Sequence, residues 1–510
     1  MEDSPLREQL FNEILLARQR VYSIRPPTPL ERLDIGTSAE VWVKREDQPP
    51  IHAYKWRGAY NCMAALSPAD RENGVVCASA GNHAQGVALA ASQLGCQATI
   101  FMPRPTPMMK RQAVALHGGE STEVLLVGDT FDESYQAAVE FARQYDRAFI
   151  HPYDDLATMG GQGTLADEVV MSGEGPFDAA FLQIGGGGMT AAVACWLKHY
   201  MPKIRIIGVE AEGQASMQAA IANDAPIKLP GLDIFCDGTA VQTAGEKTFR
   251  LCRELVDEFM TVTNQEVCNT IRSFWNWRRR IVEPAGALGL AGLLSRRDQL
   301  DGKRVLTVTC GANMDFSQLA VIAAETGVGG ATRRHFQFRI PERRGALLGL
   351  MRDALSDCNI VEFQYGKTDT EMAAPMIGFD SPDDVLRRVK HDCEQAGVEV
   401  TEISGSEDTQ FRVLRYDPTL FRSPLMIRYD FPERAGALHE FLESIQGLAN
   451  VCYFSYSYSG ERVGRALIGL EFETNTDRAA MERLLESDLD LNGRHQVLAL
   501  ETAQRILGTG

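Results

Sequence analysis

The chain has 510 residues, which is enough for about three domains of ordinary size. Its 45% hydrophobic and 23% charged residues are typical of a globular protein with a sizeable core. A net charge of -17 argues against nucleic acid and anionic membranes as partners, because both bind basic surfaces. No apolar run approaches the ~20 residues of a membrane span, and the N-terminus has no basic segment followed by an apolar run. We therefore expect neither a membrane helix nor a secretory signal.

The eleven cysteines are spaced singly, without any Cys-x-x-Cys pair. Most have apolar neighbours, as does Cys77. This pattern favours buried thiols in a reducing cytoplasm over a disulfide framework, and we expect no zinc or other metal site.

The first elements are a helix and a strand. Residues 4–22 form an amphipathic pattern with Ser4 as a candidate N-cap, and residues 26–29 are rich in proline and end it. Residues 41–47 are predicted to form a strand, which leads into the segment around Lys55.

Short apolar runs and helical patterns then alternate. The predicted strands are 74–78, 97–102, 123–127, 177–184, 204–210 and 304–310, and the predicted helices include 84–94, 107–116 and 132–145. Such alternation predicts an α/β domain built on parallel sheets. Ligands bind such sheets at the carboxyl ends of their strands.

An internal repeat follows a glycine-rich linker at 327–331. The block 341–347 recurs as 432–438, and the block 359–365 recurs as 450–456, both 91 residues on. Each copy is expected to run strand, Pro-Glu-Arg turn, helix and strand. We predict a duplicated α+β module. The alternative is a pair of domains that only drive assembly.

Lys55 directly precedes a helical pattern, and a lysine there is a candidate for a Schiff base with pyridoxal 5'-phosphate (PLP). Taken alone, it is more easily explained as a solvated surface charge. Gly185, Gly186, Gly187 and Gly188 lie between a predicted strand and a helix, where backbone N–H groups can bind a phosphate. The alternative is a flexible turn.

Two further loops follow predicted strands. The segment Ser79, Ala80, Gly81, Asn82 and His83 could bind a carboxylate through its backbone N–H groups, and Asn82 could donate to a phenolate oxygen. His83 is more easily explained as a structural residue. Cys310 ends the last strand, where its thiol could face a ring nitrogen or be a buried, inert side chain.

Together, the segment 53–59, the segment 79–86, the four glycines and the segment 310–313 resemble the PLP-dependent fold-type II enzymes, and most closely the biosynthetic threonine deaminases. The resemblance covers nearly the whole chain. It implies a catalytic domain over 1–325 with two parallel-sheet subdomains, the small one over about 55–155. It also implies two ACT-like regulatory domains, over 333–408 and 422–503.

The resemblance implies a role for each site residue. Lys55 would hold PLP as a Schiff base and then act as the base at Cα. Asn82 would bind the cofactor's 3-oxygen, and Cys310 would face its ring nitrogen. The amides of Gly185 to Gly188 and Met189 would bind the phosphate, and the loop from Ser79 to His83 would bind the substrate carboxylate.

The implied reaction is dehydration and deamination of L-threonine, and of L-serine, to 2-oxobutanoate or pyruvate and ammonia, the first committed step of isoleucine biosynthesis. Isoleucine would inhibit and valine would relieve the inhibition. The effector candidates are Gly345, Leu347 and Tyr365 in the first copy and Gly436, Leu438 and Tyr456 in the second. The resemblance also implies a cytoplasmic protein that forms a homotetramer or dimer.

Three positions depart from the family pattern: Ala53 and Cys310 are usually serine, and Tyr54 is usually phenylalanine. These departures leave the rate and the substrate preference open. A serine racemase is a rival, but it uses a serine as second base where this chain has Ala80, and only Glu210 matches its cation carboxylates. A β-replacing synthase would lack the duplicated tail, and an amino-acid sensor would not need Lys55.

Overall fold

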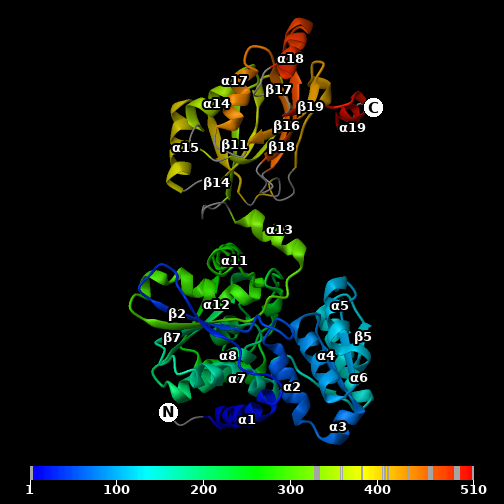
Figure 1. The fold of residues 1–510 in the computed structure, drawn as a ribbon, viewed down its shortest axis with the longest axis vertical. Helices are drawn as coiled ribbons and strands as arrows, with labels where there is room; N and C mark the ends of the chain where they lie inside the picture. Colours follow the sequence, from blue (N-terminus) through cyan, green and yellow to red (C-terminus); the bar gives the residue numbers. More distant parts are fainter. Residues whose placement is uncertain are drawn as a thin grey trace. The chain divides into compact units, whose positions relative to one another are not determined.

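The structure is a computed structural model that describes residues 4–326, 333–355, 358, 360–380, 383–404, 406, 409, 413–432, 436–457, 463–487 and 494–507. It divides into two compact units, Met1–Ile322 and Ala323–Gly510 (Figure 1). Helix α13 (Phe316–Glu325) contains the boundary between them. The predicted linker at 327–331 lies outside the described residues.

The larger sheet of the first unit has six strands. Their order is β1 (Leu30–Leu33), β2 (Glu40–Arg45), β10 (Arg304–Thr309), β7 (Ala179–Gln183), β8 (Arg205–Ala211) and β9 (Glu258–Val262). Strand β1 is antiparallel to β2, and the other neighbouring strands are parallel. Every residue of β7 is buried, because helices cover both faces of the sheet, and this explains its continuous apolar sequence.

A second, four-stranded sheet lies in the same unit. Its order is β5 (Thr122–Leu126), β4 (Ala98–Met102), β3 (Val75–Ala78) and β6 (Ala148–Phe149), and all of its strands are parallel. The helices around the two sheets are α1 (Pro5–Tyr22), α2 (Lys55–Ala65), α3 (Pro68–Asn73), α4 (Asn82–Leu94), α5 (Met108–Gly118), α6 (Phe131–Gln144), α7 (Leu156–Met171), α8 (Gly188–Tyr200), α9 (Ser216–Asn223), α10 (Glu246–Leu255), α11 (Asn264–Arg278) and α12 (Pro284–Ser295).

Helix α2 is held between α4 and α7 at very short range, which fixes the position of its first residue. A Cβ on Gly161 of α7 would lie 2.4 Å from the carbonyl oxygen of Arg57, and one on Gly86 of α4 would lie 3.0 Å from that of Lys55. Glycine is therefore required at both crossings. This close packing makes the start of α2 a rigid platform.

The second unit contains one sheet to which both copies of the repeat contribute. Its order is β13 (Met372–Ala373), β11 (Arg333–Pro341), β14 (Met376–Asp380), β12 (Ile360–Gly366), β17 (Asn450–Ser457), β18 (Val463–Glu471), β16 (Leu425–Pro432) and β19 (His495–Val497), and β15 (Glu399–Glu402) also pairs with β11. The helices are α14 (Ala346–Ala354), α15 (Asp383–Gln395), α17 (Ala437–Ser444), α18 (Asn475–Ser487) and α19 (Leu500–Leu507).

The two copies meet where β12 pairs with β17. Gln364 lies opposite Ser455, which is its own counterpart 91 residues on. Pairing of equivalent positions is the pattern that a local two-fold axis produces. The predicted order of strand, helix and strand is confirmed in each copy, although the second Pro-Glu-Arg turn extends into residues 433–435, outside the described residues.

The predicted strands and helices of the first unit are confirmed, with ends displaced by one or two residues at most positions. Sequence reasoning missed β1, β6 and β9. Strand β6 has two residues, and β1 reads Leu-Glu-Arg-Leu, so neither carries an apolar run. Among the described residues, no helix combines the length and the apolar character needed to cross a membrane.

Candidate active site

The predicted site residues lie on loops that leave the carboxyl ends of parallel strands. Lys55 follows β2, the Ser79–His83 segment follows β3, the glycine loop follows β7, and Cys310 follows β10. Strands β2, β7 and β10 belong to the six-stranded sheet and β3 to the four-stranded sheet, so loops from both sheets meet at the site. A fifth loop, which follows β6 and contains Tyr153, joins them and was not predicted.

Lys55 is the first residue of α2, and backbone contacts hold the segment before it against the end of β10. The N–H of Tyr54 donates to the carbonyl of Cys310 at 3.1 Å, and the N–H of Ala312 donates to the carbonyl of His52 at 2.8 Å. The Lys55 amine donates to the carbonyl of Pro152 at 2.9 Å. Burial lowers the pKa of this amine to about 8. A neutral amine, the form that attacks an aldehyde, is therefore accessible near physiological pH.

The glycine loop closes against Tyr153. A Cβ on Gly186 would lie 2.2 Å from the Tyr153 ring, and one on Gly188 would lie 2.7 Å from the Tyr153 carbonyl oxygen. Gly187 has φ +90° and is the N-cap of α8, whose first turn includes the buried Met189. This backbone presents N–H groups at a helix N-terminus, where a phosphate is favoured. Because Pro152 carries the Lys55 contact, one short segment links the lysine to the glycine loop.

The loop after β3 presents Asn82 at the start of α4. Its Nδ2 donates to Glu283 Oε1 at 2.7 Å, and its Oδ1 accepts from Asn313 Nδ2 at 2.8 Å. Glu283 is buried and was not predicted. Burial, and then the charge of Asp237, raise the pKa of Glu283 to about 8.

The rest of that loop divides into binding and structural parts. Ser79 Oγ accepts from the N–H of Gly81 at 3.2 Å, and Ala80 lies between them. His83 Nε2 donates to the carbonyl of Ile150 at 2.9 Å, and burial lowers the pKa of this imidazole to about 3. The ring of His83 is therefore neutral, and this hydrogen bond ties it to the fold.

Cys310 is buried, and its Sγ donates to the carbonyl of Ala285 at 3.6 Å. Burial, and then the charge of Glu283, raise the pKa of this thiol to about 12. Cys310 therefore stays a neutral, protonated thiol at physiological pH. All eleven cysteines are buried free thiols in the structure.

These groups fit PLP. The buried Lys55 amine suits its aldehyde, and the glycine loop at the start of α8 suits its phosphate. Asn82 uses only one of its two amide hydrogens on Glu283, so the other suits the 3-oxygen. A neutral thiol at Cys310 suits a ring nitrogen that is not protonated.

Sequence reasoning missed Glu283, Asn313 and Tyr153. They lie far from Lys55 in the chain, and the fold alone brings them to it. One signal was available for Glu283, which directly precedes Pro284 at the first position of helix α12. Asn313 was part of the 310–313 motif, but no role was assigned to it.

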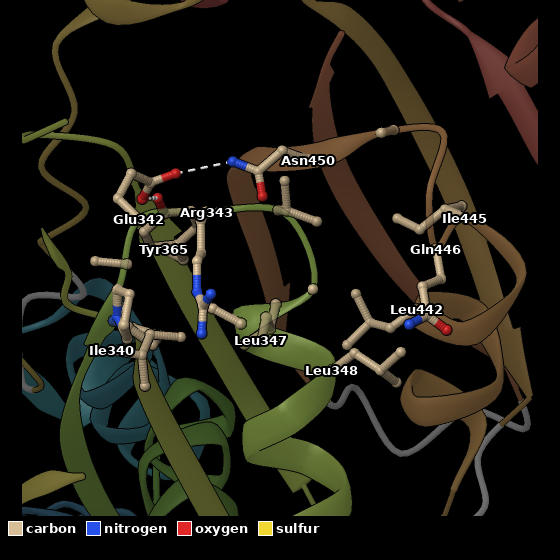
Figure 2. Close-up of a pocket in the computed structure, with 17 residues that line it drawn as sticks. Ile340, Glu342, Arg343, Leu347, Leu348, Tyr365, Leu442, Ile445, Gln446 and Asn450 are labelled. Carbon is tan, nitrogen blue, oxygen red and sulfur yellow. Dashed lines mark hydrogen bonds between the residues drawn. The ribbon is translucent and has the colours of Figure 1, made fainter. Parts of the chain in front are cut away.

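The second unit has a pocket where the two copies meet (Figure 2). Gly345, Leu347 and Tyr365 of the first copy line it, whereas Gly436, Leu438 and Tyr456 are not among its lining residues. The second copy contributes residues from the end of α17 to the start of β17 instead, including Leu442, Ile445 and Asn450. The structure therefore brings three of the six effector candidates together.

Two protein families match the chain. The family described as "Pyridoxal-phosphate dependent enzyme" matches residues 22–311, and "C-terminal regulatory domain of Threonine dehydratase" matches residues 424–494. Several curated relatives carry the name biosynthetic L-threonine dehydratase, and two of them serve as examples. The one from Burkholderia multivorans is 37% identical over 93% of this chain and 95% of its own length, and the one from Escherichia coli is 34% identical over 89% of each.

Solved structures are similar over the first unit. Threonine deaminase isoform 2 from Solanum lycopersicum, in its processed form, has a TM-score of 0.60 and 38% identity and covers 63% of this chain and 94% of its own. A serine racemase from maize has a TM-score of 0.56 and 28% identity and covers 61% of this chain and 95% of its own. The resemblance inferred from Lys55, Asn82, the glycine loop and the repeated tail is confirmed. The chain belongs to the PLP-dependent, fold-type II family of biosynthetic threonine dehydratases.

Proposed function

We propose that this protein dehydrates L-threonine, and L-serine, to an enamine that tautomerises to an imine, and that hydrolysis of the imine by water releases ammonia and gives 2-oxobutanoate or pyruvate. The observation that carries the proposal is the buried amine of Lys55, whose pKa is lowered to about 8. The loops that carry the four glycines and Asn82 meet at the same site. Its relatives are named as biosynthetic threonine dehydratases, and we propose that this reaction is the first committed step of isoleucine synthesis.

Bound PLP withdraws electrons from Cα of an amino acid and so makes the Cα proton removable. The protein's own residues then direct the outcome. The amides of Gly185 to Gly188 and Met189 hold the phosphate, and Asn82 donates to the 3-oxygen. The amides of the Ser79–His83 loop hold the substrate carboxylate. Lys55 removes the Cα proton as the base, and the β-hydroxyl leaves.

Cys310 and Ala80 favour elimination over other reactions of a PLP-bound amino acid. A neutral thiol at the ring nitrogen does not protonate it, so the ring is a weaker electron sink and prompt loss of the β-hydroxyl is favoured over transamination. The methyl side chain of Ala80 has no group that can accept or donate a proton, so this position supplies no base on the face of Cα opposite Lys55. Elimination is therefore favoured over racemisation, and no D-serine should form from L-serine.

Purified protein supplied with PLP and L-threonine should release 2-oxobutanoate and ammonia in equal amounts. Lys55→Ala should abolish product formation and the borohydride-reducible bond to the cofactor. Lys228→Ala, which changes a lysine 60% exposed on the surface, is the matched control and should keep both. Turnover in Lys55→Ala, or no 2-oxo acid from the unaltered protein, would show the proposal to be wrong.

We also propose that the pocket of Figure 2 binds the effectors isoleucine and valine. One end is polar: Tyr365 donates to Glu342, and Asn450 donates to Glu342 Oε1 at 2.9 Å. Arg343 follows in the same turn. The other end is lined by Leu347 and Leu442. These groups suit an aliphatic amino acid. The carboxylate of Glu342 can bind the ligand's ammonium group, the guanidinium of Arg343 can bind its carboxylate, and the leucines can contact its branched side chain.

The remaining assignments follow the family. We propose a catalytic domain over 1–325, with a small subdomain at about 55–155, and regulatory domains over 333–408 and 422–503. We propose a cytoplasmic homotetramer or dimer. Eleven buried free thiols support a reducing compartment. Light scattering with and without isoleucine would measure the oligomer.

A further inference from the structure

Three side chains from distant parts of the chain form a closed ring of hydrogen bonds beside Cys310. Asn82 Nδ2 donates to Glu283 Oε1 at 2.7 Å, and Asn313 Nδ2 donates to Asn82 Oδ1 at 2.8 Å. The backbone N–H of Asn313 closes the ring by donating to Glu283 Oε2 at 2.9 Å. The ring thus connects the start of α4, the residue before α12 and the loop after β10.

The ring has only one arrangement of donors and acceptors. Both oxygens of Glu283 receive an N–H, so its carboxyl group acts as an acceptor toward both Asn82 and Asn313. The amide of Asn313 cannot turn over, because its Nδ2 also donates to the carbonyl of Ile51 at 2.5 Å. Asn82 must therefore point its oxygen at Asn313 and its nitrogen at Glu283.

Glu283 is held tightly in this position. It is 2% exposed, and a Cβ on Gly311 would lie only 2.1 Å from its Oε1. A Cβ on Gly238 would lie 3.3 Å from the same atom. Two glycines thus leave just enough space for the carboxylate. Desolvating a carboxylate costs free energy, and the hydrogen bonds to Asn82 and Asn313 offset part of that cost.

We propose that Glu283 is a positioning residue that fixes the amide of Asn82 so that its second N–H faces the 3-oxygen of the cofactor. This rests on the proposed function, in which Asn82 binds that oxygen. A donor there keeps the 3-oxygen deprotonated, because a hydrogen bond to a charged oxygen favours the charged form. Glu283 itself touches neither the cofactor nor the substrate in this scheme.

The test is Glu283→Gln, which keeps the shape but replaces one acceptor by a donor. Glutamine cannot accept from both Asn82 and Asn313, so the Asn82 amide loses its single orientation. The readout is the ratio of the two absorbance bands of bound PLP, which report whether the 3-oxygen carries a proton. Loss of one hydrogen bond to a charged oxygen should change that ratio about tenfold or more toward the protonated form. kcat should fall more than KM rises.

A double-mutant cycle distinguishes action through Asn82 from a general disturbance. In an Asn82→Ala background, Glu283→Gln should change the band ratio no further. Glu210→Gln is the matched control, because Glu210 is equally buried and also accepts two N–H groups, from Met217 at 2.9 Å and Gln218 at 2.8 Å. It should leave the ratio unchanged.

Three results would overturn the proposal: an unchanged ratio in Glu283→Gln, an equal change in the Asn82→Ala background, or the same change in Glu210→Gln. If Glu283→Gln fails to fold, Asn313→Asp provides a second test. An aspartate offers no N–H to Asn82 Oδ1, so it should shift the ratio in the same direction, and an unchanged ratio there would also refute the proposal. Failure of the proposed function would look different, because the unaltered protein would then show no cofactor bands.

Discussion

At the scale of single residues, the pKa of Lys55 predicts when the protein can capture an aldehyde. Burial lowers this pKa from 10.5 to about 8, and only the neutral amine attacks. About half of Lys55 is neutral at pH 8, against less than about one per cent of an unshifted lysine. The rate at which the cofactor-free protein forms a borohydride-reducible adduct should therefore rise with pH and level off above a midpoint near 8. A midpoint near 10, or the same adduct in Lys55→Ala, would contradict this.

Residues were predictable from sequence where the chemistry sits in one short segment. Lys55 before a helix and four consecutive glycines after a strand each carry their own signal. Glu283 and Asn313 do not, because they contact Asn82 across 201 and 231 positions of the chain. The pKa shifts of Lys55 and Cys310 were equally hidden, since burial causes both and burial is a property of the folded chain.

At the scale of elements, the glycine loop depends on its contact with Tyr153. Gly186→Ala places a Cβ 2.2 Å from that ring, and overpacking of this kind costs about 1–3 kcal/mol. Displacement of the loop should raise the Kd for PLP about tenfold or more, measured by equilibrium dialysis. Gly231→Ala is the control, because nothing lies within 4 Å of its Cβ position. Adding Tyr153→Ala to Gly186→Ala should restore binding if the contact is steric.

The start of α2 also depends on a buried network of charges. Arg57 donates to Glu46 Oε2 at 2.9 Å and to Glu168 Oε1 at 2.6 Å, and Lys44 Nζ donates to Glu168 Oε2 at 2.5 Å. All four side chains are at most 3% exposed. The motif places Arg57 two residues after Lys55, so the network holds the helix that carries the catalytic amine.

Arg57→Met keeps most of the side-chain volume but leaves the two buried carboxylates, Glu46 and Glu168, to share the charge of Lys44. Breaking a buried pair in this way costs about 3–5 kcal/mol, so the free energy of unfolding measured in urea should fall by that amount. Arg253→Ala removes a surface pair, with Arg253 52% exposed, and should change it little. An equal fall in the free energy of unfolding of both variants would show that the buried network stabilises the fold no more than a surface ion pair does.

At the scale of the whole molecule, the offset of 91 residues predicted the duplication, and the antiparallel pairing of β12 with β17 shows how the copies join. The effector candidates were chosen as equivalent positions in both copies. The pocket, however, is lined by the turn and helix start of the first copy and by the end of α17 and start of β17 of the second. A repeat identifies equivalent residues but not which surfaces of two copies face each other, and that is set by the sheet they share.

This mixed lining predicts unequal effects of one substitution in the two copies. Leu347→Phe places a larger side chain inside the pocket, whereas Leu438→Phe makes the same change at the equivalent position, which does not line it. The two leucines pack against the same core, so the costs to folding should be similar. The isoleucine concentration for half-inhibition of threonine turnover should rise about tenfold or more in Leu347→Phe, because overpacking of about 1–3 kcal/mol opposes binding. In Leu438→Phe the isoleucine concentration for half-inhibition should stay within about twofold, because Leu438 does not line the pocket and its replacement should change the coupling free energy little. Equal loss of inhibition in both variants, with uninhibited turnover intact, would place the effector elsewhere.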